Sequence, residues 1–128
     1  MPKQVDFSQM EWQATPYPGV FVSCLEEEGS GEIPDFTSHA VRLDVGSKIG
    51  PHYHEREPGW MELILFPDGG DFEFRIDGQV SEYSTQMPVY RKIRPREVYG
   101  IRNRNRFPLY FFSFMKPGFS GFQEIVEA

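Results

Sequence analysis

Apolar residues along this chain fall into short runs, and no long stretch repeats them with the 3.6-residue period of an amphipathic helix. The 12 glycines and 11 prolines interrupt these runs at short intervals. Aromatic residues, which favour strands, make up 16% of the chain. The pattern therefore predicts an all-β sandwich or barrel with few helices. The expected strands are Gly19–Glu26, Ser38–Val45, His52–His54, Met61–Phe66, Asp71–Asp77, Val89–Ile93, Tyr99–Asn103 and Leu109–Met115.

The chain is short enough for one domain and long enough for a real hydrophobic core. Its 128 residues contain no internal repeat and no linker-like segment. Residues 1–15 are expected to form an N-terminal arm that pairs or packs late. The stretch Glu26–Asp35 is acidic and contains glycine, which is typical of a loop. We therefore expect a single domain over residues 1–128.

Two segments, Met61–Phe66 and Phe107–Met115, are apolar on both faces of the strand that each predicts. Such strands must be covered on both sides. A second sheet, the N-terminal arm or another subunit could provide the outer cover, and the surplus of apolar face predicts a homodimer. The first segment has Glu62, Ile64 and Phe66 on one face and Met61, Leu63 and Leu65 on the other; the second has Leu109, Phe111 and Met115 opposite Tyr110, Phe112 and Phe114.

The net charge of −6 and the pI near 5.0 argue against nucleic acid or an anionic membrane surface as the main partner. Arg102, Arg104 and Arg106 alternate along one strand, which predicts a solvated face paired with nearby acids. The alternative is that these three arginines form an anion-binding rim. Three other arginines could instead project inward and bind a carboxylate: Arg42, Arg75 and Arg91.

The cysteine content and the first residues bear on the cellular compartment. Cys24 is the single cysteine of the chain, which excludes an internal disulfide framework and a cysteine-based zinc site. Met1–Gln13 is polar and charged, unlike a signal peptide or a membrane span. These features favour a cytoplasmic protein that does not contact a membrane.

The candidate chemistry lies between Gly46 and Gly69. His52 and His54 are two residues apart, so in a strand both imidazoles point into the same space. The turn-forming pair Pro58-Gly59 then brings the chain back, and Glu62 on the returning strand can join them. Two histidines and one carboxylate can bind a mononuclear divalent metal while leaving positions open for a substrate. His39, the third histidine, is expected to be an ordinary surface or hydrogen-bonded residue.

These residues resemble the first motif of the cupins. That motif reads Gly, five residues, His-X-His, three or four residues, Glu, six residues, Gly, and this chain has Gly46, His52, His54, Glu62 and Gly69 in that order. Seven residues separate His54 from Glu62, which indicates a lengthened hairpin loop. Glu57 lies nearer to His54, but no glycine follows it at the required distance. The resemblance covers roughly residues 40–116 and implies a double-stranded β-helix, or jelly-roll, barrel with a metal in its mouth.

The second cupin motif is matched in part by Pro95–Asn103. Tyr99 stands where the family has its last metal-binding histidine. The resemblance implies that His52, His54 and Glu62 are ligands of iron, manganese, nickel or zinc. It also implies catalytic roles for Glu62 and Tyr99, where Glu62 is a ligand or a general base and Tyr99 is a weak ligand or a hydrogen-bond donor. The expected substrate-binding residues are Tyr99, Asn103 and Phe66, and the expected apolar walls are Ile64, Phe66, Phe72 or Phe74, and Phe112 or Phe114.

The leading hypothesis is a metal-dependent enzyme that acts on a small organic acid, sugar or aromatic compound. The reaction type, whether oxygenation, isomerisation or lysis, stays open because one fold hosts many chemistries. A binding or sensing cupin without turnover is the rival hypothesis, and an interaction domain with a vestigial pocket is a third. The chain contains no P-loop, dinucleotide fingerprint or nucleophile elbow.

Overall fold

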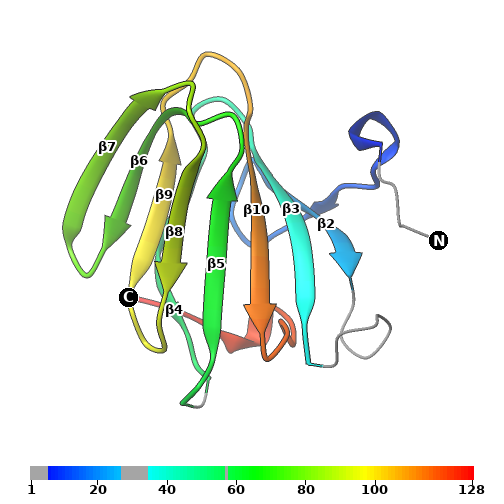
Figure 1. The fold of residues 1–128 in the computed structure, drawn as a ribbon, viewed down its shortest axis with the longest axis vertical. Helices are drawn as coiled ribbons and strands as arrows, with labels where there is room; N and C mark the ends of the chain where they lie inside the picture. The colour runs from blue at the N-terminus through cyan, green and yellow to red at the C-terminus, as the bar shows by residue number, and fades with distance from the viewer. Residues whose placement is uncertain (1–5, 27–34, 57) are drawn as a thin grey trace.

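The fold is described from a computed structural model, in which residues 6–26, 35–56 and 58–128 are described. Within these ranges the strands form two antiparallel sheets that face each other (Figure 1). One sheet has the order β1-β2-β3-β10-β5-β8 and the other β11-β4-β9-β6-β7. The elements are η1 (Phe7–Gln9), β1 (Gln13–Ala14), β2 (Val20–Glu26), β3 (Thr37–Leu43), β4 (Lys48–His54), β5 (Met61–Phe66), β6 (Gly70–Ile76), β7 (Gln79–Thr85), β8 (Val89–Ile93), β9 (Tyr99–Asn103), β10 (Leu109–Lys116), η2 (Phe122–Glu124) and β11 (Ile125–Glu127).

The all-β prediction is confirmed, and each of the eight expected strands has a counterpart in the described ranges. β5, β8 and β9 have the expected bounds, whereas β4 begins at Lys48 and is longer than expected. Three strands were not expected: β1, β7 and β11. β7 pairs along one side with β6 at the edge of its sheet and carries polar residues on both faces, so it lacks the apolar alternation of a half-buried strand. η1 and η2 are 3₁₀ helices, and neither has the length or apolar character that a membrane-spanning helix needs.

The core fills the space between the two sheets. On β5, Glu62, Ile64 and Phe66 are buried between the sheets, while Met61 is exposed, as the alternation predicts. β10 follows the same rule, with the Leu109, Phe111 and Met115 face buried. The largest fully buried apolar side chains are Trp60, Phe66, Phe72, Phe74, Leu43, Ile64, Ile93, Ile101 and Leu109.

The N-terminal segment covers part of the outer face of β10. The ring of Phe7 lies edge-on to Phe112 with centroids 5.4 Å apart, and Trp12 lies 6.1 Å from Tyr110. This contact supplies one of the three covers that the apolar pattern left open. Residues 1–5 of the expected arm and residues 27–34 of the expected acidic loop lie outside the described residues, as does Glu57.

Two glycines allow close approaches of the backbone, and the second of them lies beside the histidine strand. Gly69 has φ +63° in the turn after β5, and a Cβ there would lie 2.5 Å from the carbonyl oxygen of Thr85. β4 has an irregular register with β9 between Ile49 and His52. Gly100 of β9 lies against this bulge, where a Cβ would come within 2.9 Å of the carbonyl oxygen of Ile49. After the bulge the register resumes with His52 opposite Tyr99, so both side chains enter the same space.

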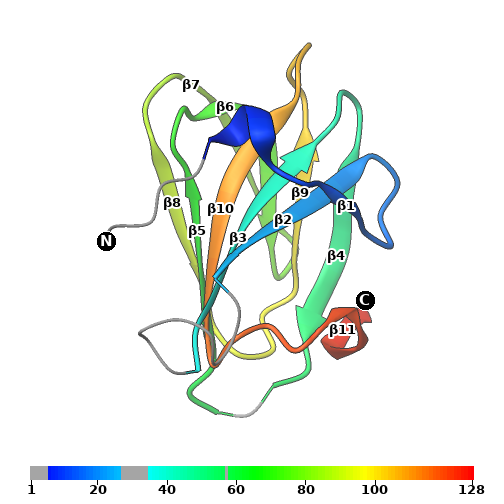
Figure 2. The same ribbon diagram turned by 90° about the vertical axis from the view of Figure 1, so that its right-hand side faces the viewer.

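The segment after β10 joins the two sheets. β10 belongs to one sheet, and β11 pairs antiparallel with β4 of the other. Figure 2 shows this segment passing from the end of β10 to β4 by way of η2. In the ladder, Ile125 is opposite His54 and Glu127 is opposite His52. The end of the chain therefore lies directly beside the two histidines.

Candidate functional site

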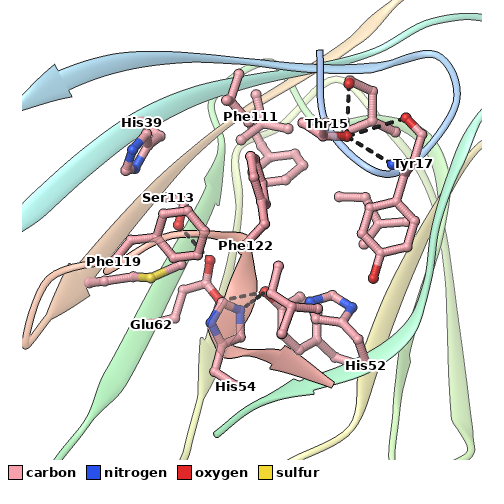
Figure 3. A pocket seen from close by; sticks show the side chains of 17 residues that line it. Thr15, Tyr17, His39, His52, His54, Glu62, Phe111, Ser113, Phe119 and Phe122 are labelled. Atoms are coloured by element: carbon pink, nitrogen blue, oxygen red, sulfur yellow. Dashed lines mark hydrogen bonds and ion pairs between the residues drawn. The ribbon is translucent and has the colours of Figure 1, made fainter. Parts of the chain in front are cut away.

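A cavity of about 80 Å³ lies between the sheets, bounded by the histidine strand and the C-terminal segment (Figure 3). His52, His54 and Glu62 lie on one side of it, and Phe111 lies on the other. Tyr99 and Ser113 line it as well. The remaining lining is mainly apolar and includes Val22, Val41, Met115, Phe119 and Phe122. The cavity thus has a polar end and an apolar body.

β4 brings both histidines to the polar end. His52 and His54 are each 2% exposed and their ring centroids are 5.5 Å apart. The Nδ1 atom of His52 lies 2.8 Å from the carbonyl oxygen of Gly50, which can only accept, so Nδ1 carries the hydrogen. Burial, opposed by the Gly50 hydrogen bond and assisted by nearby His54, lowers the pKa of His52 to about 4. His52 is therefore neutral at pH 7, with a lone pair on Nε2.

Glu62 is held by two hydroxyl groups. Tyr99 Oη donates to Oε1 over 2.5 Å, and Ser113 Oγ donates to Oε2 over 2.5 Å. Burial and the Glu62 charge raise the pKa of Tyr99 well above its ordinary value, so its hydroxyl keeps its hydrogen. His54 Nε2 lies 3.3 Å from Tyr99 Oη and 3.7 Å from Glu62 Oε1. The three side chains form one buried polar cluster.

The donor set of this cluster fits a divalent transition metal in its chemistry. Neutral imidazole and carboxylate are ordinary ligands of zinc and iron. In the described ranges, however, no three side chains of His, Cys, Asp or Glu converge closely enough to hold an ion. Both Glu62 oxygens already accept hydrogen bonds, and the Tyr99 hydroxyl lies between Glu62 and His54. His52 and His54 could thus hold an ion with both Glu62 hydrogen bonds in place, and Glu62 could join them if Tyr99 released Oε1.

Two expected substrate-binding residues, Asn103 and Phe66, do not line this cavity. Asn103 donates from Nδ2 to the carbonyl oxygens of Leu43, Asp44 and Phe107, and so ties together the loops at the end of β9. Phe66 stacks on Phe72 with centroids 4.1 Å apart in the core. Both residues face inward as predicted, but they lie at a depth where side chains fill the space between the sheets.

The other expected walls and anchors are also absent from the lining. The cavity lining among the described residues includes neither Ile64 nor Phe72, and it contains no arginine or lysine. Arg42 lies over the ring of Phe21 at 4.5 Å, and Arg91 donates to Tyr83 Oη over 2.7 Å. Arg102, Arg104 and Arg106 are all exposed as predicted, but β9 ends at Asn103, so only Arg102 lies on the strand. Arg104 lies 3.0 Å from Glu82 at the surface.

The structure adds residues that the sequence reasoning missed. His39 lines the cavity from β3, where its ring meets that of Phe119 edge-on with centroids 5.7 Å apart. Burial lowers its pKa. Its two-residue spacing from the apolar Val41 in an expected strand was the available signal. Tyr17 and Glu124 carried no such signal, because their place beside the histidines depends on segments distant in the sequence.

Comparison with known proteins shows which solved structures have a similar fold. No family model matches the sequence, and no curated protein matches it. Solved structures do match. KdgF from Halomonas sp. is 20% identical, with 91% of this chain and 94% of that chain covered and a TM-score of 0.66. A predicted oxalate decarboxylase from Thermotoga maritima is 17% identical, with 89% and 98% covered and a TM-score of 0.70. An RmlC-like cupin from Shewanella frigidimarina is 13% identical, with 91% and 92% covered and a TM-score of 0.64.

Proposed function

We propose, from the premise that this chain has the cupin fold, that the protein is a metal-dependent enzyme acting on a small organic molecule. One observation carries the proposal. His52, His54, Glu62 and Tyr99 meet at one end of a cavity whose other walls are mainly apolar. Binding sites for small molecules commonly combine apolar walls with a few convergent polar groups.

His52 and His54 would hold the metal through Nε2, with Glu62 as the third ligand once Tyr99 releases it. Iron, manganese, nickel and zinc all suit such donors. When bound, a metal of this kind acts as a Lewis acid on an oxygen of the ligand. The ligand would direct an oxygen-bearing group toward the histidines and an apolar part toward Val41 and Phe111. The cavity of about 80 Å³ limits it to a small molecule.

Glu62 and Tyr99 would take part in proton transfer from the bound ligand. Tyr99 Oη carries its hydrogen toward Glu62 Oε1 in the structure. When a ligand oxygen enters, the Tyr99 hydroxyl turns to donate to that oxygen and frees Oε1. Ser113 keeps Oε2 in place through its own hydrogen bond. In the alternative in which Glu62 is not a metal ligand, its Oε1 then accepts a proton from the ligand as a general base.

A second candidate is a binding or sensing protein that takes up the same ligand without changing it. One observation favours it: both Glu62 oxygens are engaged by hydroxyls, and no three-residue metal cluster is preformed in the described ranges. In that case Glu62 and Tyr99 shape the pocket, and the ligand is bound without being converted to a product.

Metal content and product formation test these candidates in turn. Wild-type protein and His52→Ala are supplemented with iron, manganese, nickel and zinc and analysed by elemental analysis. We expect close to one metal per wild-type chain and at least a tenfold lower affinity in the variant, since even indirect partners of a metal contribute about 10–100-fold. Equal, near-zero metal in both proteins would rule out the site.

Small carboxylates, sugars and catechols are then screened for binding by thermal shift, and each ligand found is incubated with the metal-loaded protein in air. Products that disappear in Glu62→Gln, with ligand binding retained, support the enzyme and the role of Glu62. Ligands that bind wild-type protein but are never changed, with or without air, support the binding protein instead.

A further inference from the structure

The C-terminal segment contributes a buried carboxylate to the back of the histidine pair. Glu124 is 5% exposed and lies at the end of η2. Backbone hydrogen bonds fasten this segment to the histidine strand on either side of it. Glu55 N donates to Glu124 O over 2.8 Å, and Ala128 N donates to Pro51 O over 3.0 Å. The backbone of Glu124 is therefore fixed relative to His54.

The contacts of Glu124 leave one oxygen for His54. Its Oε1 accepts a hydrogen bond from Ser120 N over 3.0 Å. Its Oε2 lies 3.5 Å from His54 Nδ1 and 3.7 Å from Arg56 Nε. Among the described residues, neither Glu124 Oε2 nor His54 Nδ1 has another hydrogen-bond partner, although both atoms are buried. A buried polar atom left unpaired destabilises the fold, so a slight approach that pairs the two is favoured.

Such a bond determines where the hydrogen of His54 resides. A carboxylate is an acceptor only, so the bond requires the hydrogen on Nδ1 and leaves the lone pair on Nε2. Nε2 lies 3.3 Å from Tyr99 Oη, which can accept from Nε2–H in the opposite tautomer because the Tyr99 hydrogen is directed at Glu62. The contact with Glu124 therefore selects between two tautomers. His52 has the same arrangement, with its Nδ1 donating to the Gly50 carbonyl. Ligand histidines commonly donate their second ring N–H to a carboxylate or carbonyl in this way.

We propose that Glu124 is a positioning residue that fixes the Nδ1–H tautomer and the ring orientation of His54. The C-terminal segment then completes the site, because among the described residues the barrel strands offer His54 Nδ1 no hydrogen-bond partner. The effect of Glu124 on metal binding rests on the proposed function. The tautomer of His54 is independent of that function.

The test is the tautomer of His54 in metal-free protein, read from the ¹⁵N shifts and long-range couplings of the imidazole ring. We expect Nδ1–H for both His54 and His52 in the wild type. Glu124→Ala should convert His54 to a mixture or to Nε2–H and leave His52 unchanged. Glu124→Gln should retain Nδ1–H, because the amide oxygen can still accept. Glu127→Ala is the matched control, since it removes an exposed carboxylate from the same segment.

Zinc affinity, measured by competition with a chelator, gives the second readout. It should fall about 10–100-fold in Glu124→Ala, less in Glu124→Gln, and stay unchanged in Glu127→Ala. An Nε2–H tautomer in wild-type protein would overturn the inference without any variant, as would an unaltered Nδ1–H signal in Glu124→Ala. Because the spectra are recorded without metal, they decide the role of Glu124 whether or not the protein binds zinc. The wild-type zinc titration decides the proposed function separately.

Discussion

Tyr99 donates its hydroxyl hydrogen to Glu62 Oε1 over 2.5 Å, and the same hydroxyl oxygen lies 3.3 Å from His54 Nε2. Tyr99 belongs to one sheet and Glu62 to the other, so this bond crosses the interior. Glu62 Oε1 itself lies 3.7 Å from His54 Nε2, so the hydroxyl contacts both groups that the proposed metal would use. The bond therefore couples the availability of Glu62 to the position of one hydroxyl.

The first prediction concerns this hydroxyl. Tyr99→Phe should lower the free energy of unfolding by about 1–3 kcal/mol, because Glu62 Oε1 loses its buried partner. The same change should tighten zinc binding, because Glu62 Oε1 and His54 Nε2 become free. Urea unfolding and chelator competition measure the two effects. Ser113→Ala is the control, since it frees the other Glu62 oxygen; zinc binding that tightens equally in both variants would contradict the coupling.

The second prediction concerns ligand charge. The lining of the cavity among the described residues includes the Glu62 carboxylate and no arginine or lysine side chain. Metal-free protein should therefore bind benzyl alcohol at least about tenfold more tightly than benzoate, because an anion beside Glu62 is desolvated without a counter-charge. Zinc should narrow or reverse this preference. Calorimetric titration of both ligands, with and without zinc, measures it. Tighter binding of benzoate than of benzyl alcohol by the metal-free protein would contradict the prediction and would show that a positive charge lies close to the cavity.

The third prediction concerns the contact between β4 and β9. Gly100→Ala should destabilise the fold by about 1–3 kcal/mol, because the added methyl group meets the Ile49 carbonyl and forces the bulge to move. Gly50→Ala is the matched control, since its Cβ would make an ordinary contact at 3.8 Å with Tyr17. Urea unfolding of both variants provides the measurement. Similar stabilities would indicate that the bulge yields without cost.

The fourth prediction concerns pH. Burial lowers the pKa of His39 below its ordinary value of 6.5 in the folded protein. Above pH 6.5 the imidazole is neutral in both states, and as the pH falls the unfolded state takes up the proton first. The stability that His39 contributes above pH 6.5 is therefore lost on acidification through its folded pKa. Unfolding free energies between pH 7.5 and pH 5 should fall more steeply in wild type than in His39→Gln; parallel curves would refute the effect.

The fifth prediction concerns assembly. We expect a homodimer in which the outer face of β5 and β10 is buried, because Met61 and Tyr110 remain exposed there. Light scattering should give about twice the 14.9 kDa chain mass. Met61→Lys should shift the protein toward monomer, whereas Val80→Lys, at an exposed position on the other sheet, should not. A wild-type mass near that of a single chain would show that the N-terminal segment suffices as cover.

The sequence by itself determined the strands and the face on which each side chain lies. Alternation with a period of two is a local property, so it placed His52 and His54 together and turned Tyr99 inward. It also separated the buried and exposed sides of β5 and β10. The same locality explains the strands that were missed, since β7 is polar and β11 forms against β4 at the far end of the chain.

Only the tertiary structure decided which inward residues meet. Alternation assigns a face but gives no depth along the barrel, so Phe66 and Asn103 face inward and still do not line the cavity. The pairing of Glu62 with Tyr99 and Ser113 depends on the register of strands from two sheets. Glu124 reaches His54 because the chain crosses between those sheets after β10. Such contacts join residues far apart in the sequence, and no local pattern of apolar and polar positions encodes them.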